Sequence, residues 1–161
     1  MSEFGVVDYR DEFYLKAFRR WYVIKSLIRN SKFRHGVSLE KAALVDFLLC
    51  NPPTLQKLLV HFGKAEPVLN LEELLYQNNM EFGEGFETRD FSTTCVLLIS
   101  IGYVSFAKLD GEILLHSDSG DLNLESPLVM RWEKELSLLQ PLLSKSKNVL
   151  FNAIHGAANG N

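Results

Sequence analysis

The sequence predicts a mainly α-helical protein with one small β-hairpin. Apolar residues recur at helical spacing through most of the chain, one hairpin-turn dipeptide separates two β-prone runs, and 47% of the 161 residues are hydrophobic. We expect a helical N-terminal half, then a winged helix-turn-helix, then a C-terminal helix. A chain of this length fits one domain, which we place at residues 1–155, and we expect residues 156–161 to form a disordered tail.

The first two helices are predicted from apolar spacing and from capping residues. The first helix covers about residues 11–30, and Ser38 can cap the N-terminus of the second, which Asn51, Pro52 and Pro53 end. The apolar residues of the first helix share one face: Tyr14, Ala17, Phe18, Trp21, Ile24 and Ile28.

Two shorter helices are expected next. One runs from near Thr54 to Gly63, because glycine is favoured just beyond a helix end. The other begins where Asn70 and Glu73 resemble a capping box. Residues 80–87 then form an acidic, glycine-containing loop.

The region around residues 88–115 has the pattern of a winged helix. Residues 88–100 predict a helix despite several β-branched side chains, and Gly102 is placed to end it. Asp110 and Gly111 form a hairpin-turn pair between two short strands. The order of helix, helix, then helix with tight hairpin is that of a winged helix-turn-helix, in which the hairpin is the wing.

A last helical segment is expected to begin at Ser126 and Pro127, a capping residue followed by proline in the first turn. Pro141 kinks or splits this segment, and a second stretch continues to about Ile154. Its first part carries an apolar face: Leu128, Trp132, Leu136 and Leu139.

Composition excludes a membrane-spanning or secreted protein. No run of 18 uncharged apolar residues exists, and the N-terminus lacks the basic flank and apolar stretch of a signal peptide. We therefore expect a cytoplasmic protein without a membrane span. Cys50 and Cys95 lie far apart inside apolar runs, which predicts two reduced core thiols and no disulfide.

No recognisable catalytic or metal-ligand spacing occurs in the sequence. Gly83 and Gly85 resemble a phosphate loop, but the surrounding glutamates would repel phosphate. The acidic run at residues 118–125 lacks the ligand order of a calcium loop. We predict no catalytic residue, no metal, no cofactor and no small-molecule substrate. The histidines are scattered, without a metal-ligand partner: His35, His61, His116 and His155.

Charge is distributed unevenly although the net charge is only −3. Seven basic residues and no acid lie between residues 13 and 35: Lys16, Arg19, Arg20, Lys25, Arg29, Lys32 and Arg34. Such a strip could contact a nucleic-acid backbone. It is equally consistent with a solvated face, or with a strip matched to an acidic partner or to this chain's own acidic loop.

The expected wing is acidic, which predicts that it faces protein or water. Its charged residues would repel a duplex: Asp110, Glu112, Asp118 and Asp121. The helix before the wing offers Arg89, Asp90 and hydroxyl side chains, whereas a recognition helix normally presents several base-reading side chains.

Three segments resemble the middle components of bacterial ABC-three-component systems, which include the small C subunit of Lamassu-type anti-phage and anti-plasmid defence. They are residues 20–25 (RWYVIK), 39–52 (LEKAALVDFLLCNP) and 98–104 (LISIGYV), within a resemblance that covers about residues 14–155. The resemblance implies a non-catalytic adaptor that joins an SMC-like ATPase to an effector, often a nuclease. It also implies that the adaptor helps to keep the effector inactive.

A transcriptional regulator is the alternative interpretation. A dimeric winged helix would bind a specific duplex, and that binding would depend on Arg89, Thr93 or Thr94.

Overall fold

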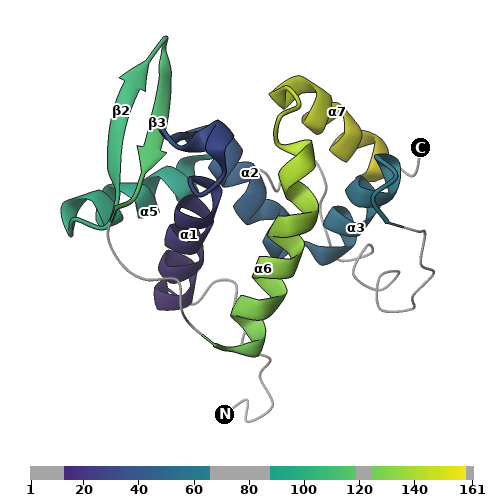
Figure 1. The fold of residues 1–161 in the computed structure, drawn as a ribbon, viewed down its shortest axis with the longest axis horizontal. Helices are drawn as coiled ribbons and strands as arrows, with labels where there is room; N and C mark the ends of the chain where they lie inside the picture. Colours follow the sequence, from purple (N-terminus) through teal and green to yellow (C-terminus); the bar gives the residue numbers. More distant parts are fainter. Residues whose placement is uncertain (1–12, 66–87, 119–124, 159–161) are drawn as a thin grey trace.

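A computed structural model describes residues 13–65, 88–118 and 125–158 (Figure 1). Over these residues the protein is mainly helical with a small three-stranded antiparallel sheet, as predicted. The predicted helix at Asn70, the loop at 80–87 and the lead-in before residue 11 lie outside the described residues. The elements in chain order are α1 (Phe13–Leu27), η1 (Ser31–Phe33), β1 (Val37–Ser38), α2 (Leu39–Cys50), α3 (Pro52–His61), α5 (Thr88–Ser100), β2 (Ser105–Leu109), β3 (Glu112–His116), α6 (Pro127–Leu139), η2 (Gln140–Leu142) and α7 (Lys147–Ala158).

Helices α1, α2 and α5 pack against one another and enclose the core beneath the sheet. Ile24 of α1, Leu48 of α2 and Phe91 of α5 are almost fully buried there. Leu115 of β3 closes this core from the sheet side. The trio therefore forms one hydrophobic unit, and burial of the large apolar side chains stabilises it.

The sheet has the order β1-β3-β2, with both pairings antiparallel. Val37 of β1 lies opposite Leu115, and in the hairpin Phe106 lies opposite Leu115 while Leu109 lies opposite Glu112. We did not predict β1, which consists of only two residues. The hairpin rises from the C-terminal end of α5 and projects beyond the helices (Figure 1).

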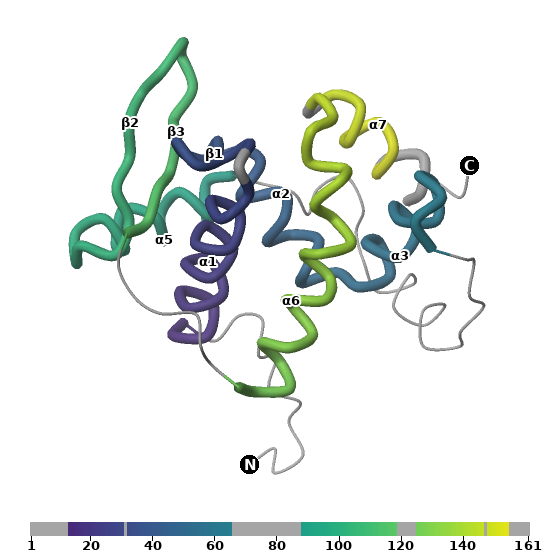
Figure 2. The backbone as a smooth tube through the Cα atoms, viewed as in Figure 1, coloured from purple at the N-terminus to yellow at the C-terminus, as the bar shows by residue number. Residues whose placement is uncertain are grey.

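The C-terminal segments form the other end of the molecule. Helix α6 packs on α2, and α7 packs on α3 (Figure 2). Trp132 of α6 contacts the rings of Phe18 and Tyr22, with centroids 5.9 and 5.6 Å away, and so joins α6 to α1. None of the described helices is long and apolar enough to cross a membrane.

Local capping signals placed most helix boundaries correctly. Ser38 and Ser126 accept hydrogen bonds from the backbone N–H groups of Lys41 and Val129, at 3.2 and 3.1 Å. Gly102, with φ +84°, ends α5 in the left-handed conformation as predicted.

The hairpin turn is also confirmed. Asp110 and Gly111 have φ values of 52° and 81°, and positive values at both positions are typical of a type I′ turn.

Three boundaries differ from the prediction. Helix α1 ends at Leu27, before the expected end at about residue 30. Helix α3 begins at Pro52 because proline, which lacks an N–H, suits the first turn. Helix α7 extends to Ala158, so residues 156–158 are helical where we predicted a disordered tail.

Candidate protein-interaction face

Two arginines of the expected basic strip lie inside the protein. Arg19 and Arg20 are 3% and 7% exposed, and both donate to the carboxylate of Asp46 on α2. The Nε atoms of Arg19 and Arg20 lie 2.5 and 3.1 Å from the two Asp46 oxygens. The prediction that Arg19 and Arg20 contact a nucleic-acid backbone is therefore wrong, because a buried charge needs an internal partner and here has one.

Arg20 also fixes the position of α5. Its guanidinium donates to the Asp90 carboxylate at 2.7 Å, to the Asp90 carbonyl at 2.9 Å and to the Thr94 hydroxyl at 2.6 Å. The hydrogen bond from Arg20 holds the pKa of Asp90 below its usual value. One side of α5 is thus occupied by α1.

Two further basic residues of the strip make contacts within the chain. Lys16 lies 3.5 Å from Asp90, and Lys25 donates to the Ser117 carbonyl at 3.1 Å. The Ser117 hydroxyl accepts from the Trp21 indole at 3.1 Å and donates to the Tyr103 carbonyl at 2.6 Å. These bonds tie α1 to the base of the hairpin.

Three of the seven predicted basic residues are exposed. Arg29, Lys32 and Arg34 lie at the C-terminal end of α1 and in the turn that follows. The expected basic strip of seven residues is therefore reduced to a short basic end near η1.

The acidic residues of the hairpin are where the sequence placed them. Asp110 and Glu112 are exposed at the tip, and Asp118 is exposed beyond β3, 3.3 Å from Nδ1 of His116. Asp121 lies outside the described residues.

The structure adds a feature that we did not predict, an apolar surface on the end of α5 and the hairpin. Of the eleven large apolar side chains exposed in the described residues, six fall between residues 96 and 113, so exposure is concentrated here. We call five of these six residues the apolar hairpin face, without Leu109, which points to the other side of the hairpin: Val96, Ile101, Tyr103, Phe106 and Ile113.

Strand register explains why side chains of this face stay in solvent. Opposed residues share a side of a hairpin, so Phe106 and Ile113 lie on the same side as Leu115. Leu115 lies on the central strand β3 and is buried against the helices, whereas Phe106 lies on the edge strand β2 and is 60% exposed. Leu109 projects from the opposite side, beside Glu112.

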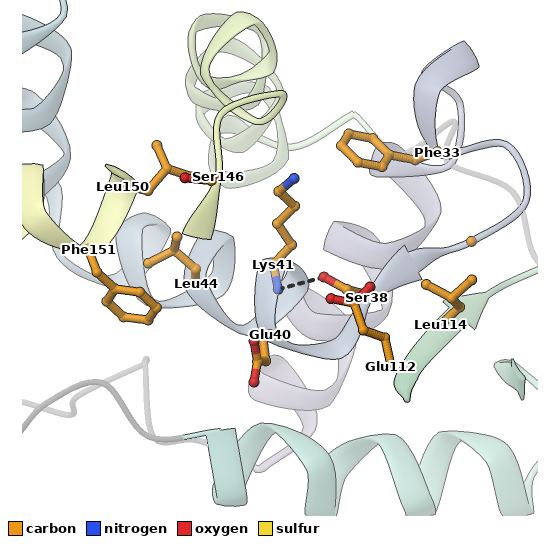
Figure 3. Close-up of a pocket in the computed structure, with 11 residues that line it drawn as sticks. Phe33, Ser38, Glu40, Lys41, Leu44, Glu112, Leu114, Ser146, Leu150 and Phe151 are labelled. Atoms are coloured by element: carbon orange, nitrogen blue, oxygen red, sulfur yellow. Dashed lines mark hydrogen bonds between the residues drawn. The ribbon is translucent and has the colours of Figure 1, made fainter. Parts of the chain in front are cut away.

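A separate pocket of about 380 Å³ lies between the sheet, α2 and α7 (Figure 3). Lys41 extends into it between Phe33 and Ser146, with its ammonium 5.4 Å from the Phe33 ring centroid. Burial lowers the pKa of Lys41. Glu40 and Glu112 also line the pocket, so its charges are mixed.

No protein-family model, curated protein sequence or solved structure matches this chain significantly. The function of the chain must therefore be inferred from its own structure. Within residues 13–65, 88–118 and 125–158, no three His, Cys, Asp or Glu side chains are grouped so that they could hold a metal ion. The most distinctive surface of the described chain is the apolar hairpin face.

Proposed function

We propose that this chain is a non-catalytic subunit that binds another protein through the apolar hairpin face. The observation that carries the proposal is the concentration of exposed large apolar side chains between residues 96 and 113, on α5 and the hairpin that follows it. Clustered exposed apolar side chains on a soluble protein mark interaction sites, whereas scattered ones need no explanation. Transfer of such side chains from water into an interface is favourable by about 25 cal/mol per Å² of apolar area.

The arrangement that presents this face is, in our proposal, a winged helix-turn-helix. Helices α1, α2 and α5 would be its three helices and β2-β3 its wing, with α3 and the segment after it inserted before α5. The mutual packing of these helices and the sheet order β1-β3-β2 support this assignment. An apolar wing with acids at its tip favours a polypeptide partner over a polyanion.

At a finer level we propose an adaptor in a bacterial anti-phage or anti-plasmid defence complex. It would bridge an SMC-like ATPase and an effector nuclease in the cytoplasm and help to keep the effector inactive. The support is the resemblance of residues 20–25, 39–52 and 98–104 to middle components of ABC-three-component systems, together with a surface suited to protein binding.

Direct DNA contact by this subunit would be confined to its exposed basic end. Arg29, Lys32 and Arg34 could each neutralise a phosphate, which gives a weak and salt-sensitive interaction. Such a contact would place the adaptor beside DNA already held by the ATPase.

Co-expression with the products of neighbouring genes tests the proposal. The full chain should co-purify with an ATPase and an effector. A Val96→Ser/Ile113→Ser variant should recover at least tenfold less partner, because it removes apolar side chains from α5 and from the helix-facing side of the hairpin. Met130→Ser is the matched control, since Met130 is 64% exposed on α6 and Val96 is 67% exposed.

Two results would overturn this function. One is a chain that co-purifies with none of its neighbours, and the other is a hairpin variant that binds as well as the control. The alternative, a transcriptional regulator, is favoured only by the proposed winged-helix arrangement. It predicts sequence-specific duplex binding that Arg89→Ala or Thr93→Ala abolishes, whereas the adaptor proposal predicts no sequence-specific binding.

A further inference from the structure

Strand β2 forms an open edge of the sheet. In the order β1-β3-β2 it pairs only with β3, and no described residue pairs with its outer side. All five of its residues are exposed. The hairpin also stands clear of the helical body in both backbone views (Figures 1 and 2). A strand edge of this kind is a template for pairing with another strand.

The hairpin register shows which backbone groups point outward. In a hairpin with a two-residue turn, the residues that flank the turn form a hydrogen-bonded pair, here Leu109 and Glu112. Hydrogen-bonded and non-hydrogen-bonded pairs then alternate along the strands. The N–H and C=O groups of Phe106 and Lys108 therefore face the open edge.

We propose that the β2 edges of two copies of this chain pair antiparallel about a twofold axis at Ala107. Hydrogen bonds between the two strands form only where a residue whose backbone groups face the open edge lies opposite another such residue. Because Phe106 and Lys108 are the two such residues of β2, three registers are possible. Phe106 can meet Phe106, Lys108 can meet Lys108, or Phe106 can meet Lys108 of the second copy.

The third register is favoured by length and by charge. It pairs all five residues of β2, whereas each of the other two pairs only three. The Lys108 register also sets like charges directly opposite each other, which destabilises a pair of strands.

Side chains in the favoured register are complementary. Each Phe106 ring would lie opposite a Lys108 ammonium of the second copy, an arrangement that supports a cation–π contact on each side of the axis. Ala107, the smallest residue of the strand, lies on the axis itself. An edge lysine commonly blocks strand association, but here the register directs Lys108 to an aromatic ring.

The interface consists of one short strand from each copy, so the dimer should be weak. Stable dimers bury about 1,200 Å² or more, and one strand edge buries less. We therefore expect a concentration-dependent equilibrium. Its measured mass should rise from 18.3 kDa towards twice that value as the concentration increases.

Disulfide trapping in the full chain tests the register. Ala107 meets Ala107 of the second copy as a non-hydrogen-bonded pair, with Cα atoms about 4.5 Å apart, a separation that suits a disulfide. An Ala107→Cys chain should cross-link to itself in a thiol–disulfide buffer. Ser105→Cys alone should not, because its two copies would lie roughly 13 Å apart. A mixture of Ser105→Cys and Leu109→Cys chains should cross-link only between the two kinds.

The unsubstituted chain measures the background from Cys50 and Cys95. Lys108→Pro is the disrupting variant, since proline removes an outward-facing donor while the inward hydrogen bonds of the hairpin remain. Introduced into the otherwise unsubstituted chain, it should weaken self-association at least tenfold and leave the circular dichroism spectrum unchanged.

The proposal is overturned if the unsubstituted chain keeps the mass of one copy at every concentration. It is also overturned if Ala107→Cys cross-links no faster than Ser105→Cys. Neither result bears on capture of an ATPase or effector, because that experiment alters Val96 and Ile113 and leaves the β2 edge intact.

Discussion

Replacement of Asp46 by alanine should destabilise the protein more than any single surface substitution. Asp46 is 4% exposed and accepts from both Arg19 and Arg20, so its loss removes the carboxylate that two buried guanidinium groups share. Removing one partner of a buried ion pair typically costs about 3–5 kcal/mol. Arg20 keeps its bonds to Asp90 and Thr94, so its own share of the penalty should be reduced.

Urea denaturation followed by far-ultraviolet circular dichroism measures this effect. With a slope of about 2 kcal/mol per M, a loss of about 4 kcal/mol lowers the midpoint by about 2 M. Lys16→Ala is the control within the same network. In its 3.5 Å pair with Asp90 the lysine is half-buried and the aspartate is exposed, and pairs at the surface contribute about 0–1 kcal/mol.

A double variant separates charge from packing. Arg19→Met in the Asp46→Ala background removes one buried charge that has lost its Asp46 partner and keeps an apolar stem, so it should recover part of the lost free energy of unfolding. A decrease of less than about 1 kcal/mol in the unfolding free energy of Asp46→Ala would refute the reasoning, because removing one partner of a buried ion pair costs more than that. Further loss in the double variant would refute it as well.

Five other predictions follow from backbone geometry and titration. Gly36→Ala should lower the unfolding free energy by about 1–3 kcal/mol, because its added Cβ would lie 3.0 Å from a neighbouring Cβ at φ +133°. Gly63→Ala, at φ +70° with nothing within 4 Å, should lower it by only about 1 kcal/mol in the same urea assay. Burial raises the pKa of the Cys95 thiol to about 12, so its alkylation at pH 8 should be limited by protein opening, and alkylation at the rate of a free thiol would contradict this. The pKa of Asp90 is lowered in the folded protein, so its carboxylate contributes stability above the pKa of an unfolded Asp, and this contribution is lost as pH falls through the folded pKa. Asp90→Asn should therefore make the unfolding free energy less dependent on pH in the acid range. Burial raises the pKa of Glu135, so its contribution is lost as pH rises through the folded value, and Glu135→Gln should raise stability at pH 7 relative to pH 4.

Local signals in the sequence were sufficient for most of the fold. Ser38, Ser126 and the Asp110–Gly111 turn act through hydrogen bonds and dihedral preferences within a few residues, so they are readable without tertiary structure. Strand β1 was missed for the opposite reason. Two residues carry no periodicity, and Val37 becomes a strand only because Leu115 lies opposite it, far along the chain.

The burial of Arg19 and Arg20 could not be predicted without the tertiary structure, although the sequence contains one signal for it. Asp46 stands within the apolar segment at residues 42–49, and an acid on a buried helix face needs a cationic partner. That signal predicts a buried arginine somewhere but does not say which one. The apolar hairpin face left no signal at all, because a strand that projects beyond the core has the same composition as one that packs on it.

Weak pairing of the β2 edges and recognition through the apolar hairpin face would reinforce each other. A twofold pair of hairpins extends the sheet through β3 and β2 into the second copy and presents the helix-facing side chains twice. Two linked sites turn the second binding event into an intramolecular one, which can raise overall affinity by about 10²–10⁴ without any new contact. Because the second copy contributes only a strand edge to the pair, Val96 and Ile113 stay available on both copies. An adaptor built in this way could hold two partner chains together at concentrations where the isolated dimer is largely dissociated.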